Sequence, residues 1–241
     1  MSKNYEGLSI TFYKYYKLND LDIERKNFYE LLERCDVKGK IIIAKEGING
    51  AVAGKTRNVE KFMKDIKEFP NLFDLSFRVT KTNQECFKRR LVKIRPELVP
   101  LGKDEVSPKT EGGGKKITPK ELKKWYEEGK EFKILDARND YEYEIGRFKN
   151  SLNPNITKFR DFKNSLGKFK DLKEKPIVTF CTGGIRCEKA SALMKKKGFN
   201  NVYKLEGGII EFMKVDTQKK YWEGELFVFD KRETITHKDV V

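Results

Sequence analysis

A stretch rich in proline and glycine divides the chain into two parts. Residues 100–119 read PLGKDEVSPKTEGGGKKITP, with three prolines, a run of three glycines and few apolar side chains. This composition is typical of a linker, because proline and glycine interrupt regular structure and polar side chains add nothing to a core. The 241 residues are enough for two small domains. We therefore expect a domain over residues 1–99, a linker over 100–118, a second domain over 119–214 and a C-terminal tail over 215–241.

The apolar pattern before residue 100 predicts strands and helices in the order β-α-β-β-α-β. We expect strands at residues 8–15, 40–45, 51–53 and 74–80, and helices at 20–35 and 59–69. A further strand is expected at Leu91–Ile94. This order is that of a ferredoxin-like α+β sandwich.

Two local details of this first domain are also predicted. Five apolar side chains of the first helix are expected to face the core: Leu21, Ile23, Phe28, Leu31 and Leu32. The segment Gly47–Gly50 contains Asn-Gly, a dipeptide favoured in tight turns that need a positive φ. We expect this segment to be the turn of a hairpin, with direct contact to RNA as the alternative.

The second part of the chain alternates strands with helices. Thr118 and Pro119 begin a helix, because threonine caps helices and proline fits the first helical position. Strands are expected at residues 132–135, 176–180 and 202–205, and a helix at 188–197 that ends at Gly198. Such alternation predicts a parallel sheet with helices on its faces. The predicted fold class is thus a ferredoxin-like α+β sandwich followed by an α/β domain.

A cysteine and an arginine share one loop of this α/β domain. The loop reads Cys181, Thr182, Gly183, Gly184, Ile185, Arg186. It follows a buried strand and precedes a helix, which is where ligands bind in open α/β sheets. The glycines let backbone N–H groups turn inward, and the helix N-terminus and Arg186 add positive charge. These features favour a thiolate and predict a nucleophilic Cys181. The alternative is an inert buried cysteine followed by an ordinary glycine turn.

These residues resemble the active-site loop of rhodanese-like domains. The C-x4-R loop is accompanied by the segment from Asp136 to Gly146 and by the segment Gly198–Gly208, both similar to blocks of that family. The resemblance covers about residues 117–212. It implies a loop cysteine that takes up sulfur as a persulfide cradled by backbone N–H groups. Related phosphatases have a loop one residue longer, so sulfur-type chemistry is favoured over phosphate hydrolysis.

A narrower resemblance covers nearly the whole chain. The run CTGGIRCEKAS at residues 181–191 is similar to the motif of the oxygen-dependent tRNA uridine hydroxylases, which contain a rhodanese domain. Further blocks of that family match residues 45–50, 52–54, 91–95, 99–102, 222–225 and 227–230. The chain departs from the family at Leu226, where cysteine is common, and it lacks the cysteine-rich C-terminal extension of longer relatives.

This resemblance implies an enzyme that hydroxylates the wobble uridine of tRNA at C5. Molecular oxygen would be the co-substrate, the tRNA anticodon loop the partner, and Cys181 the essential residue. Two alternatives stay open. One is a persulfide sulfurtransferase that moves sulfur through Cys181 to a small thiol or a protein acceptor, and the other is an RNA-binding module with a vestigial loop. A reductant or sulfur-donor protein is a further expected partner.

Three residues near the loop are candidates for accessory roles. Cys187 could resolve a persulfide or form a transient disulfide with Cys181, or it could simply pack in the helix. Asp136 and Arg138 could position the loop from the neighbouring strand end, or form a purely structural pair. Arg186 and the loop N–H groups are expected to hold an anionic species on Cys181.

The sequence argues against a metal centre or a Rossmann cofactor site. Neither a CxxC nor a GxGxxG motif occurs, and His237 is the single histidine. A zinc site or a His/carboxylate iron triad is therefore not expected, and no cofactor is identified. Cys35 and Cys86 lie in no charged loop and in no partner motif, and both are expected to be structural.

A basic excess is spread over both parts of the chain, with a formal net charge of +15. Such a charge fits a polyanionic partner such as tRNA, although most of the basic residues are lysines, which also solvate ordinary surfaces. The densest candidate RNA-binding run consists of Lys88, Arg89, Arg90, Lys93 and Arg95. If residues 91–94 form a strand, Lys93 and Arg95 share one face. The alternative for this run is a solvated surface without a ligand.

The sequence indicates no membrane attachment. Its first residues lack the apolar core of a secretory signal, and no stretch approaches the roughly 20 apolar residues of a membrane span. We expect a soluble cytoplasmic protein.

Overall fold

The chain folds into two compact units. The computed structural model describes residues 6–102, 106–108 and 112–241. Unit 1 comprises residues up to Leu98 together with Phe229–Glu233 and Lys238–Val241. Unit 2 comprises Val99–Val228 and Thr234–His237.

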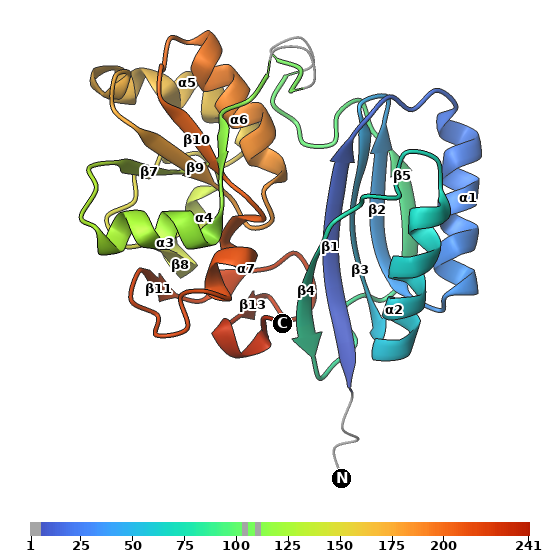
Figure 1. The fold of residues 1–241 in the computed structure, drawn as a ribbon. Coiled ribbons are helices and arrows are strands. Elements are labelled where there is room, and N and C mark those ends of the chain that lie inside the picture. The colour runs from blue at the N-terminus through green and yellow to red at the C-terminus, as the bar shows by residue number, and fades with distance from the viewer. Residues whose placement is uncertain (1–5, 103–105, 109–111) are drawn as a thin grey trace. The chain divides into compact units, whose positions relative to one another are not determined.

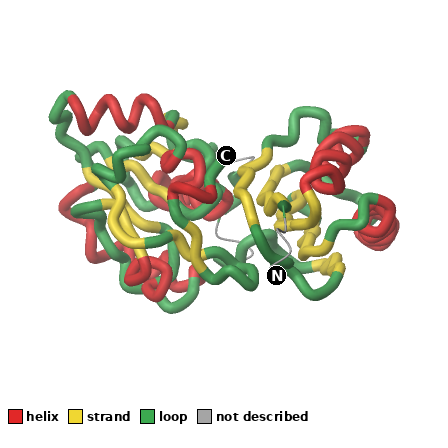
Figure 2. The backbone as a smooth tube through the Cα atoms, turned by 90° about the horizontal axis from the view of Figure 1, so that it is seen from below, coloured by secondary structure: helices red, strands yellow, loops and turns green. Residues whose placement is uncertain are grey.

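Unit 1 contains the predicted β-α-β-β-α-β order followed by one more strand. Its elements are β1 (Gly7–Tyr15), α1 (Leu21–Arg34), β2 (Lys38–Ala44), β3 (Gly47–Lys55), α2 (Thr56–Asp65), a 3-10 turn η1 (Ile66–Glu68), β4 (Phe77–Thr82) and β5 (Arg90–Ile94). The strand order is β4-β1-β3-β2-β5, antiparallel except that β5 runs parallel to β2. Helices α1 and α2 cover one face of this sheet (Figures 1 and 2). The predicted ferredoxin-like sandwich is confirmed.

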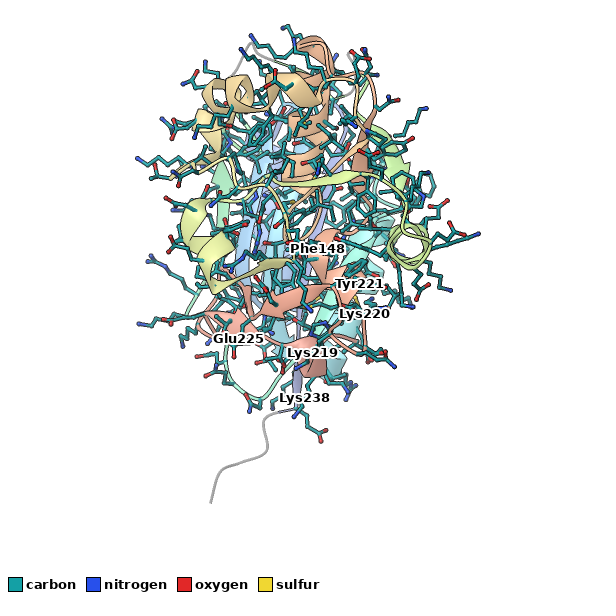
Figure 3. The ribbon with its side chains drawn as sticks, turned by 90° about the vertical axis from the view of Figure 1, so that its left-hand side faces the viewer. Phe148, Lys219, Lys220, Tyr221, Glu225 and Lys238 are labelled. Atoms are coloured by element: carbon teal, nitrogen blue, oxygen red, sulfur yellow. The ribbon has the colours of Figure 1, made fainter. Side chains whose placement is uncertain are left out.

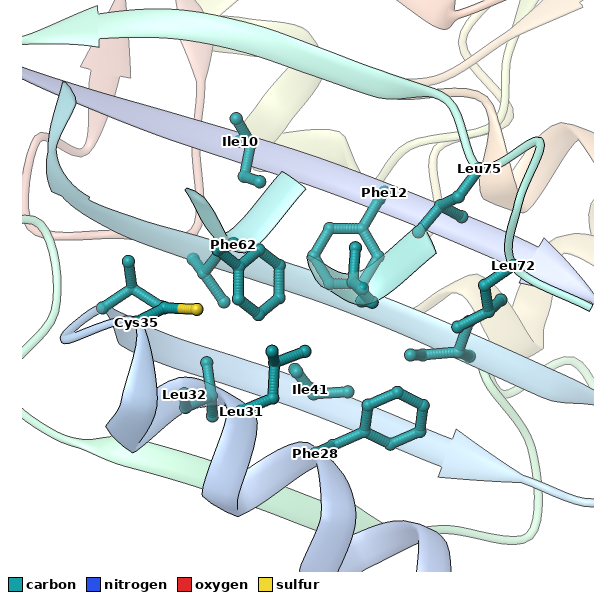
Figure 4. Packing of buried hydrophobic residues seen from close by; sticks show 14 of the residues in the cluster. Ile10, Phe12, Phe28, Leu31, Leu32, Cys35, Ile41, Phe62, Leu72 and Leu75 are labelled. Carbon is teal, nitrogen blue, oxygen red and sulfur yellow. The ribbon is translucent and has the colours of Figure 1, made fainter. Parts of the chain in front are cut away.

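The core of unit 1 lies between the sheet and these helices. Phe12, Phe28 and Ile41 meet there, each almost fully buried (Figure 4). The prediction for Ile23 was wrong, because its side chain is 57% exposed. At 100° per residue, Ile23 lies about 140° around the helix from Phe28 and so faces solvent.

The predicted turn at Gly47–Gly50 is displaced. The hairpin between β2 and β3 turns at Lys45 and Glu46, so Gly47–Gly50 lies within β3. Gly50 has a packing role, because a Cβ atom there would come within 2.3 Å of the Phe12 ring. The Asn-Gly pair therefore indicates close packing against a neighbouring strand and not a turn.

Unit 2 is an α/β domain with a four-stranded parallel sheet in the order β6-β10-β9-β7. Its elements are β6 (Lys115–Ile117), α3 (Pro119–Glu127), β7 (Lys133–Asp136), α4 (Asp140–Ile145), β8 (Gly146–Phe148), α5 (Phe162–Ser165), β9 (Ile177–Phe180), α6 (Ile185–Lys196), β10 (Val202–Leu205), α7 (Gly208–Met213), β11 (Trp222–Gly224), β12 (Leu226–Phe227) and β13 (Thr234–Ile235), with 3-10 turns at Phe159–Asp161 and Leu166–Leu172. A last 3-10 turn at His237–Asp239 begins in unit 2 and ends in unit 1. Thr118 caps α3 in a capping box with Glu121. The predicted parallel sheet is confirmed.

The predicted linker is largely part of unit 2. Residues 103–105 and 109–111 lie outside the described residues, but Leu101 and Val106 belong to the core of unit 2, and Lys115–Ile117 pairs with β10. The glycine run also approaches other backbone, since a Cβ atom on Gly114 would lie 2.7 Å from the Val202 carbonyl oxygen. The described residues of the expected linker over 100–118 therefore belong to unit 2.

An aromatic cluster in unit 2 supports the end of β9. The ring of Phe148, labelled in Figure 3, lies 4.8 Å from that of Phe180 and 5.4 Å from that of Trp222, measured between centroids. Trp222 opens β11, which pairs with β8. Because Phe180 directly precedes Cys181, this packing fixes where the strand delivers the cysteine.

The residues after 214 do not form a separate tail. They supply β11, β12 and β13 to unit 2 and two segments to unit 1, Phe229–Glu233 and Lys238–Val241, which we call the C-terminal strap. Within unit 1 the backbone N–H of Val241 donates to the Val79 carbonyl at 3.3 Å. The C-terminal residues are thus built into both units.

A buried ion pair anchors the strap. Arg232 donates to the Asp230 carboxylate at 2.6 and 2.8 Å and to the Thr80 hydroxyl and Lys81 carbonyl at 3.0 Å each. The Ser9 hydroxyl donates to Asp230 at 3.3 Å. The side chains of Arg232 and Asp230 are only 9% and 5% exposed. This pair joins the strap to β1 and β4.

We predict that Asp230→Ala destabilises unit 1 by about 3 kcal/mol, because it leaves the Arg232 guanidinium buried without its counter-ion. The matched control is Glu30→Ala, which removes an exposed pair with Lys26 on α1 and should cost less than about 1 kcal/mol.

The measurement is native-state hydrogen exchange of the β1 and β4 amides. Fluorescence is unsuitable because both tryptophans, Trp125 and Trp222, belong to unit 2. Equal protection in the two variants would show that the strap does not stabilise the sheet.

Candidate active site

Cys181 lies at the carboxyl end of β9, a strand between β10 and β7 in the parallel sheet of unit 2. The loop continues through Thr182 and Gly183 to Gly184, and α6 begins at Ile185. The helix starts three residues earlier than predicted, so Arg186 and Cys187 lie in its first turn. The thiol therefore sits next to a helix N-terminus, where the backbone N–H groups have no partners within the helix.

The loop stabilises a thiolate on Cys181. Gly184 adopts a φ of 101°, which turns its backbone N–H toward the sulfur at 3.1 Å. Burial by itself raises the pKa of the Cys181 thiol, but a hydrogen bond from Cys187, the charge of Arg186 and the backbone N–H groups of Arg186 and Gly184 outweigh it. Together they lower the pKa from 9.0 to about 6. At neutral pH the thiolate is the major form.

Arg186 shares its charge between the thiolate and a buried carboxylate. Its guanidinium donates to both oxygens of Glu142 at 2.6 and 2.8 Å, and the Glu142 side chain is fully buried. Burial works against an ionised Glu142, but the charge and hydrogen bonds of Arg186 hold its pKa below the usual range. The Thr182 hydroxyl donates to Glu142 and accepts from Arg186, both at 3.4 Å.

Glu142 was not among the site residues predicted from the sequence. It is the third residue of α4, where its carboxylate also accepts the backbone N–H of Asn139 at 3.1 Å in a capping box. Its only signal in the sequence was its place in the segment between Asp136 and Gly146. The structure shows that this carboxylate positions Arg186.

Asp136 and Arg138 form a buried pair beside the site. Arg138 donates to the Asp136 carboxylate at 2.6 to 3.1 Å and to the Gly146 carbonyl at 2.6 Å, and both side chains are buried. The guanidinium also lies between the rings of Phe180 and Trp222, 5.5 and 5.3 Å from their centroids. The described hydrogen bonds of the pair do not reach the Cys181 loop, but its charges act on the site, because Asp136 raises the pKa of Arg186 and Arg138 lowers the pKa of Glu142. A role of the pair in positioning the loop stays a prediction.

Helix α7 packs directly against the loop. The backbone N–H groups of Ile209 and Ile210 donate to the carbonyls of Cys181 and Thr182 at 3.0 and 3.2 Å. Gly208, with a φ of 66°, makes this approach possible, because a Cβ atom there would lie 2.3 Å from the Cys181 carbonyl oxygen. This contact explains the glycine at position 208, whereas at Gly207, with a φ of 71°, a Cβ atom would collide with the Glu211 side chain.

The four cysteines differ in their electrostatic surroundings. All are buried and free. Burial and the neighbouring Cys181 raise the pKa of Cys187 well above its usual value, so Cys187 stays a thiol and donates to Cys181. Burial also raises the pKa values of Cys35 and Cys86. Only Cys181 has a lowered thiol pKa.

The predicted basic run does not form one surface. Lys88 and Arg89 precede β5 and are exposed. Arg90 donates to the carbonyls of Leu32 and Val37 and to Asp36, the last at 2.7 Å, so it is a structural residue. Lys93 and Arg95 lie on the opposite face of β5 from Arg90, as alternation along the strand requires.

The described residues contain neither a cluster of metal-binding side chains nor a helix fit to cross a membrane. Over residues 6–102, 106–108 and 112–241, no group of three or more His, Cys, Asp or Glu side chains could hold a metal ion. Within the same ranges, no helix combines the length and apolar character that crossing a bilayer requires.

Comparison with known proteins places the chain in a family. The UPF0176 acylphosphatase-like domain matches residues 8–98, and the rhodanese-like domain matches residues 118–214. A tRNA uridine(34) hydroxylase of Onion yellows phytoplasma is 41% identical over 96% of this chain and 75% of its own length. That of Legionella pneumophila strain Paris is 38% identical over 95% of this chain and 90% of its own. The chain belongs to the tRNA uridine(34) hydroxylase family.

Membership of this family confirms the resemblance drawn from the sequence motifs, and the two domain models confirm the fold class. Solved structures similar to unit 2 include a rhodanese-like domain from Anabaena, 21% identical over 45% of this chain and 78% of that chain, with a TM-score of 0.39. A rhodanese-like domain protein from Staphylococcus aureus is 26% identical over 41% of this chain and 90% of that chain, with a TM-score of 0.34. The catalytic role of Cys181 stays a prediction. Leu226, where the sequence motifs indicated a departure from the family, is fully buried in β12.

We predict that alkylation of Cys181 follows a titration with a midpoint near pH 6 and that Cys187→Ala moves this midpoint upward, because it removes a hydrogen bond to the thiolate. Cys187→Ser keeps a donor and should shift it less. Alkylation rates of the individual cysteines by iodoacetamide are measured against pH by peptide mass spectrometry. Cys35 and Cys86 serve as internal controls that react only at higher pH. An unchanged midpoint in Cys187→Ala would exclude this hydrogen bond as a cause of the low pKa.

We predict that Gly208→Ala displaces the loop and raises the Cys181 pKa toward 9.0, because the new methyl group would collide with the loop carbonyls. The matched control is Gly129→Ala. Gly129 has a similar φ of 64° but open space around its Cβ position, so it carries only the backbone strain of about 1 kcal/mol. The same titration is the readout, and a low Cys181 pKa retained in Gly208→Ala would contradict the prediction.

Proposed function

We propose that this protein hydroxylates the wobble uridine of tRNA and that the Cys181 loop of unit 2 is its active site. Support comes from the family, whose curated members carry the name tRNA uridine(34) hydroxylase over nearly the whole length of this chain. The observation that carries the assignment of the site is the lowered pKa of Cys181 in its cradle of N–H groups. A thiolate at neutral pH is the nucleophile that a reaction centred on this cysteine needs.

The proposed reaction replaces the C5–H bond of the uridine by a C5–OH bond. One atom of molecular oxygen enters the base and the other leaves as water. The balance requires two electrons and two protons, which we assign to an external reductant. Arg186 and the loop N–H groups would hold an anionic sulfur or oxygen species on Cys181, while Glu142 keeps the guanidinium in place.

The proposed substrate element is the anticodon loop. A base in a single-stranded loop can be turned outward without breaking a duplex, so it can reach a thiolate at the end of a strand. Reductant and sulfur-donor proteins remain proposed partners of this reaction.

Sulfur transfer is the second candidate, because the same cradle suits a persulfide. The Gly184 N–H and the Arg186 charge would stabilise the terminal sulfur anion of a persulfide on Cys181 as well as the thiolate itself. The two functions differ in their products, an oxygen added to tRNA or a sulfur delivered to an acceptor.

The test is nucleoside mass spectrometry of unmodified tRNA incubated in air with the pure protein. We expect one added oxygen on the wobble uridine, absent without air and absent in Cys181→Ala. Cys35→Ala is the matched control, since it removes a buried cysteine of unit 1 whose pKa is raised, and should keep the activity. Glu142→Gln should lower the rate at least tenfold, because a neutral amide no longer anchors Arg186.

The same variants are then expressed in cells that lack the modification, which supplies any missing reductant or partner. Wobble uridine left unmodified both in vitro and in these cells would overturn the hydroxylase proposal. Release of sulfur from a thiosulfate donor by the wild type, but not by Cys181→Ala, would then favour sulfur transfer.

A further inference from the structure

On the face of the unit 1 sheet away from α1 and α2, a group of three basic side chains comes from β2 and from β5 with the residue after it. In β2, Ile41 and Ile43 are fully buried in the core. Because side chains alternate along a strand, the preceding Lys40 lies on the opposite face. Lys40 and Arg95 are exposed, and Lys93 is half-buried.

The register of β2 and β5 brings these side chains together. The two strands are parallel neighbours, with Ile41 opposite Val92 and Ile42 opposite Lys93. Val92 and Ile94 pack against the core, which puts Lys93 and Arg95 on the face of Lys40. The Arg95 N–H extends the ladder by donating to the Ile43 carbonyl at 2.9 Å. Lys40, Lys93 and Arg95 are hereafter the open-face cluster.

The three charges of the open-face cluster repel one another. Although Lys40 is exposed, contact with its neighbours partly desolvates its ammonium group, and this effect, followed by the charges of Lys93 and Arg95, lowers the pKa of Lys40. None of the three forms an ion pair or a side-chain hydrogen bond with another described residue, in contrast to Arg90, which is paired with Asp36. Three close cations without a carboxylate are unfavourable by themselves and are stabilised by an anion.

We propose that the open-face cluster binds the phosphodiester backbone of the tRNA substrate. This proposal rests on the proposed function, which makes RNA the polyanion that the protein must hold. Exposed basic side chains of this kind position a nucleic acid through its phosphates without reading its bases. The cluster offers no helix N-terminus or buried donor that would enclose a single small anion, whereas side chains spread along two strands suit a chain of phosphates.

The experiment compares two triple variants of the full chain that remove the same charge. Lys40→Gln/Lys93→Gln/Arg95→Gln neutralises the open-face cluster. Lys26→Gln/Arg57→Gln/Lys64→Gln neutralises two lysines and one arginine on α1 and α2, on the opposite side of the sheet. The probe is a fluorescently labelled anticodon stem-loop RNA, and its dissociation constant is measured by anisotropy over a range of salt concentrations.

We expect the cluster variant to bind the RNA about tenfold more weakly or worse, with the slope of log K against log salt reduced by about 2 to 3. The helix-side variant should change binding less than about threefold. An equal loss in both variants would reduce the effect to net charge and overturn the proposal, as would unchanged binding in the cluster variant. A cluster variant that loses binding to anionic lipid vesicles but keeps RNA binding would assign the face to a membrane surface instead and overturn it as well.

Measurements of KM and kcat for hydroxylation distinguish a failure of the binding surface from a failure of the proposed function. If the wild type hydroxylates the RNA, the cluster variant should have a raised KM and a kcat within about twofold of the wild type. The reason is that the proposed contacts of the cluster are to the phosphodiester backbone of the RNA and not to the reacting base. If the wild type binds through the cluster but leaves tRNA unmodified in vitro and in cells, the proposed function fails while the binding surface stands. Hydroxylation with an unchanged KM in the cluster variant would overturn the inference and leave the proposed function intact.

Discussion

The bidentate pair between Glu142 and Arg186 is the interaction on which the candidate site depends. A buried guanidinium without a counter-ion would be costly, and a buried thiolate needs a cation nearby. Arg186 meets both needs because one carboxylate fixes its plane while its charge still reaches Cys181. Since Glu142 comes from α4 and Arg186 from α6, the pair also ties two helices to the end of β9. Charge balance and geometry at the site therefore have the same origin.

The candidate site also depends on glycines, because they let the backbone approach the Cys181 loop closely. Gly184 turns its N–H toward the sulfur, and Gly208 lets α7 donate to the loop carbonyls. The loop is thus held by two main-chain hydrogen bonds from α7, which any side chain at Gly208 would block, and by the bond from the Gly184 N–H to the Cys181 sulfur. Gly50 follows the same principle in unit 1, where its lack of a Cβ atom leaves room for Phe12. In each case the glycine serves packing density more than flexibility.

The elements that the sequence predicted well are those whose signal is local. Alternating or continuous apolar runs predicted the five strands of unit 1 and three of the four strands in the parallel sheet of unit 2. The Cys181 loop was recognisable because its residues are consecutive. What could not be predicted depends on distant residues. Glu142 and Arg186 are 44 positions apart, and Lys40 joins Lys93 only through the register of parallel strands. Asn-Gly misled because the same dipeptide fits a turn and a close strand contact, and tertiary packing decided between them.

The C-terminal strap has a consequence for how the protein is made. Unit 1 begins near the start of the chain, yet Asp230, Arg232 and Val241 complete its β1 and β4 edge. A domain at the N-terminus would ordinarily finish folding while the ribosome is still translating the next one. Here the sheet can form early, but its last contacts wait until unit 2 has been synthesised. Maturation of the two units is therefore coupled in time, and an mRNA that ends early leaves both of them unfinished.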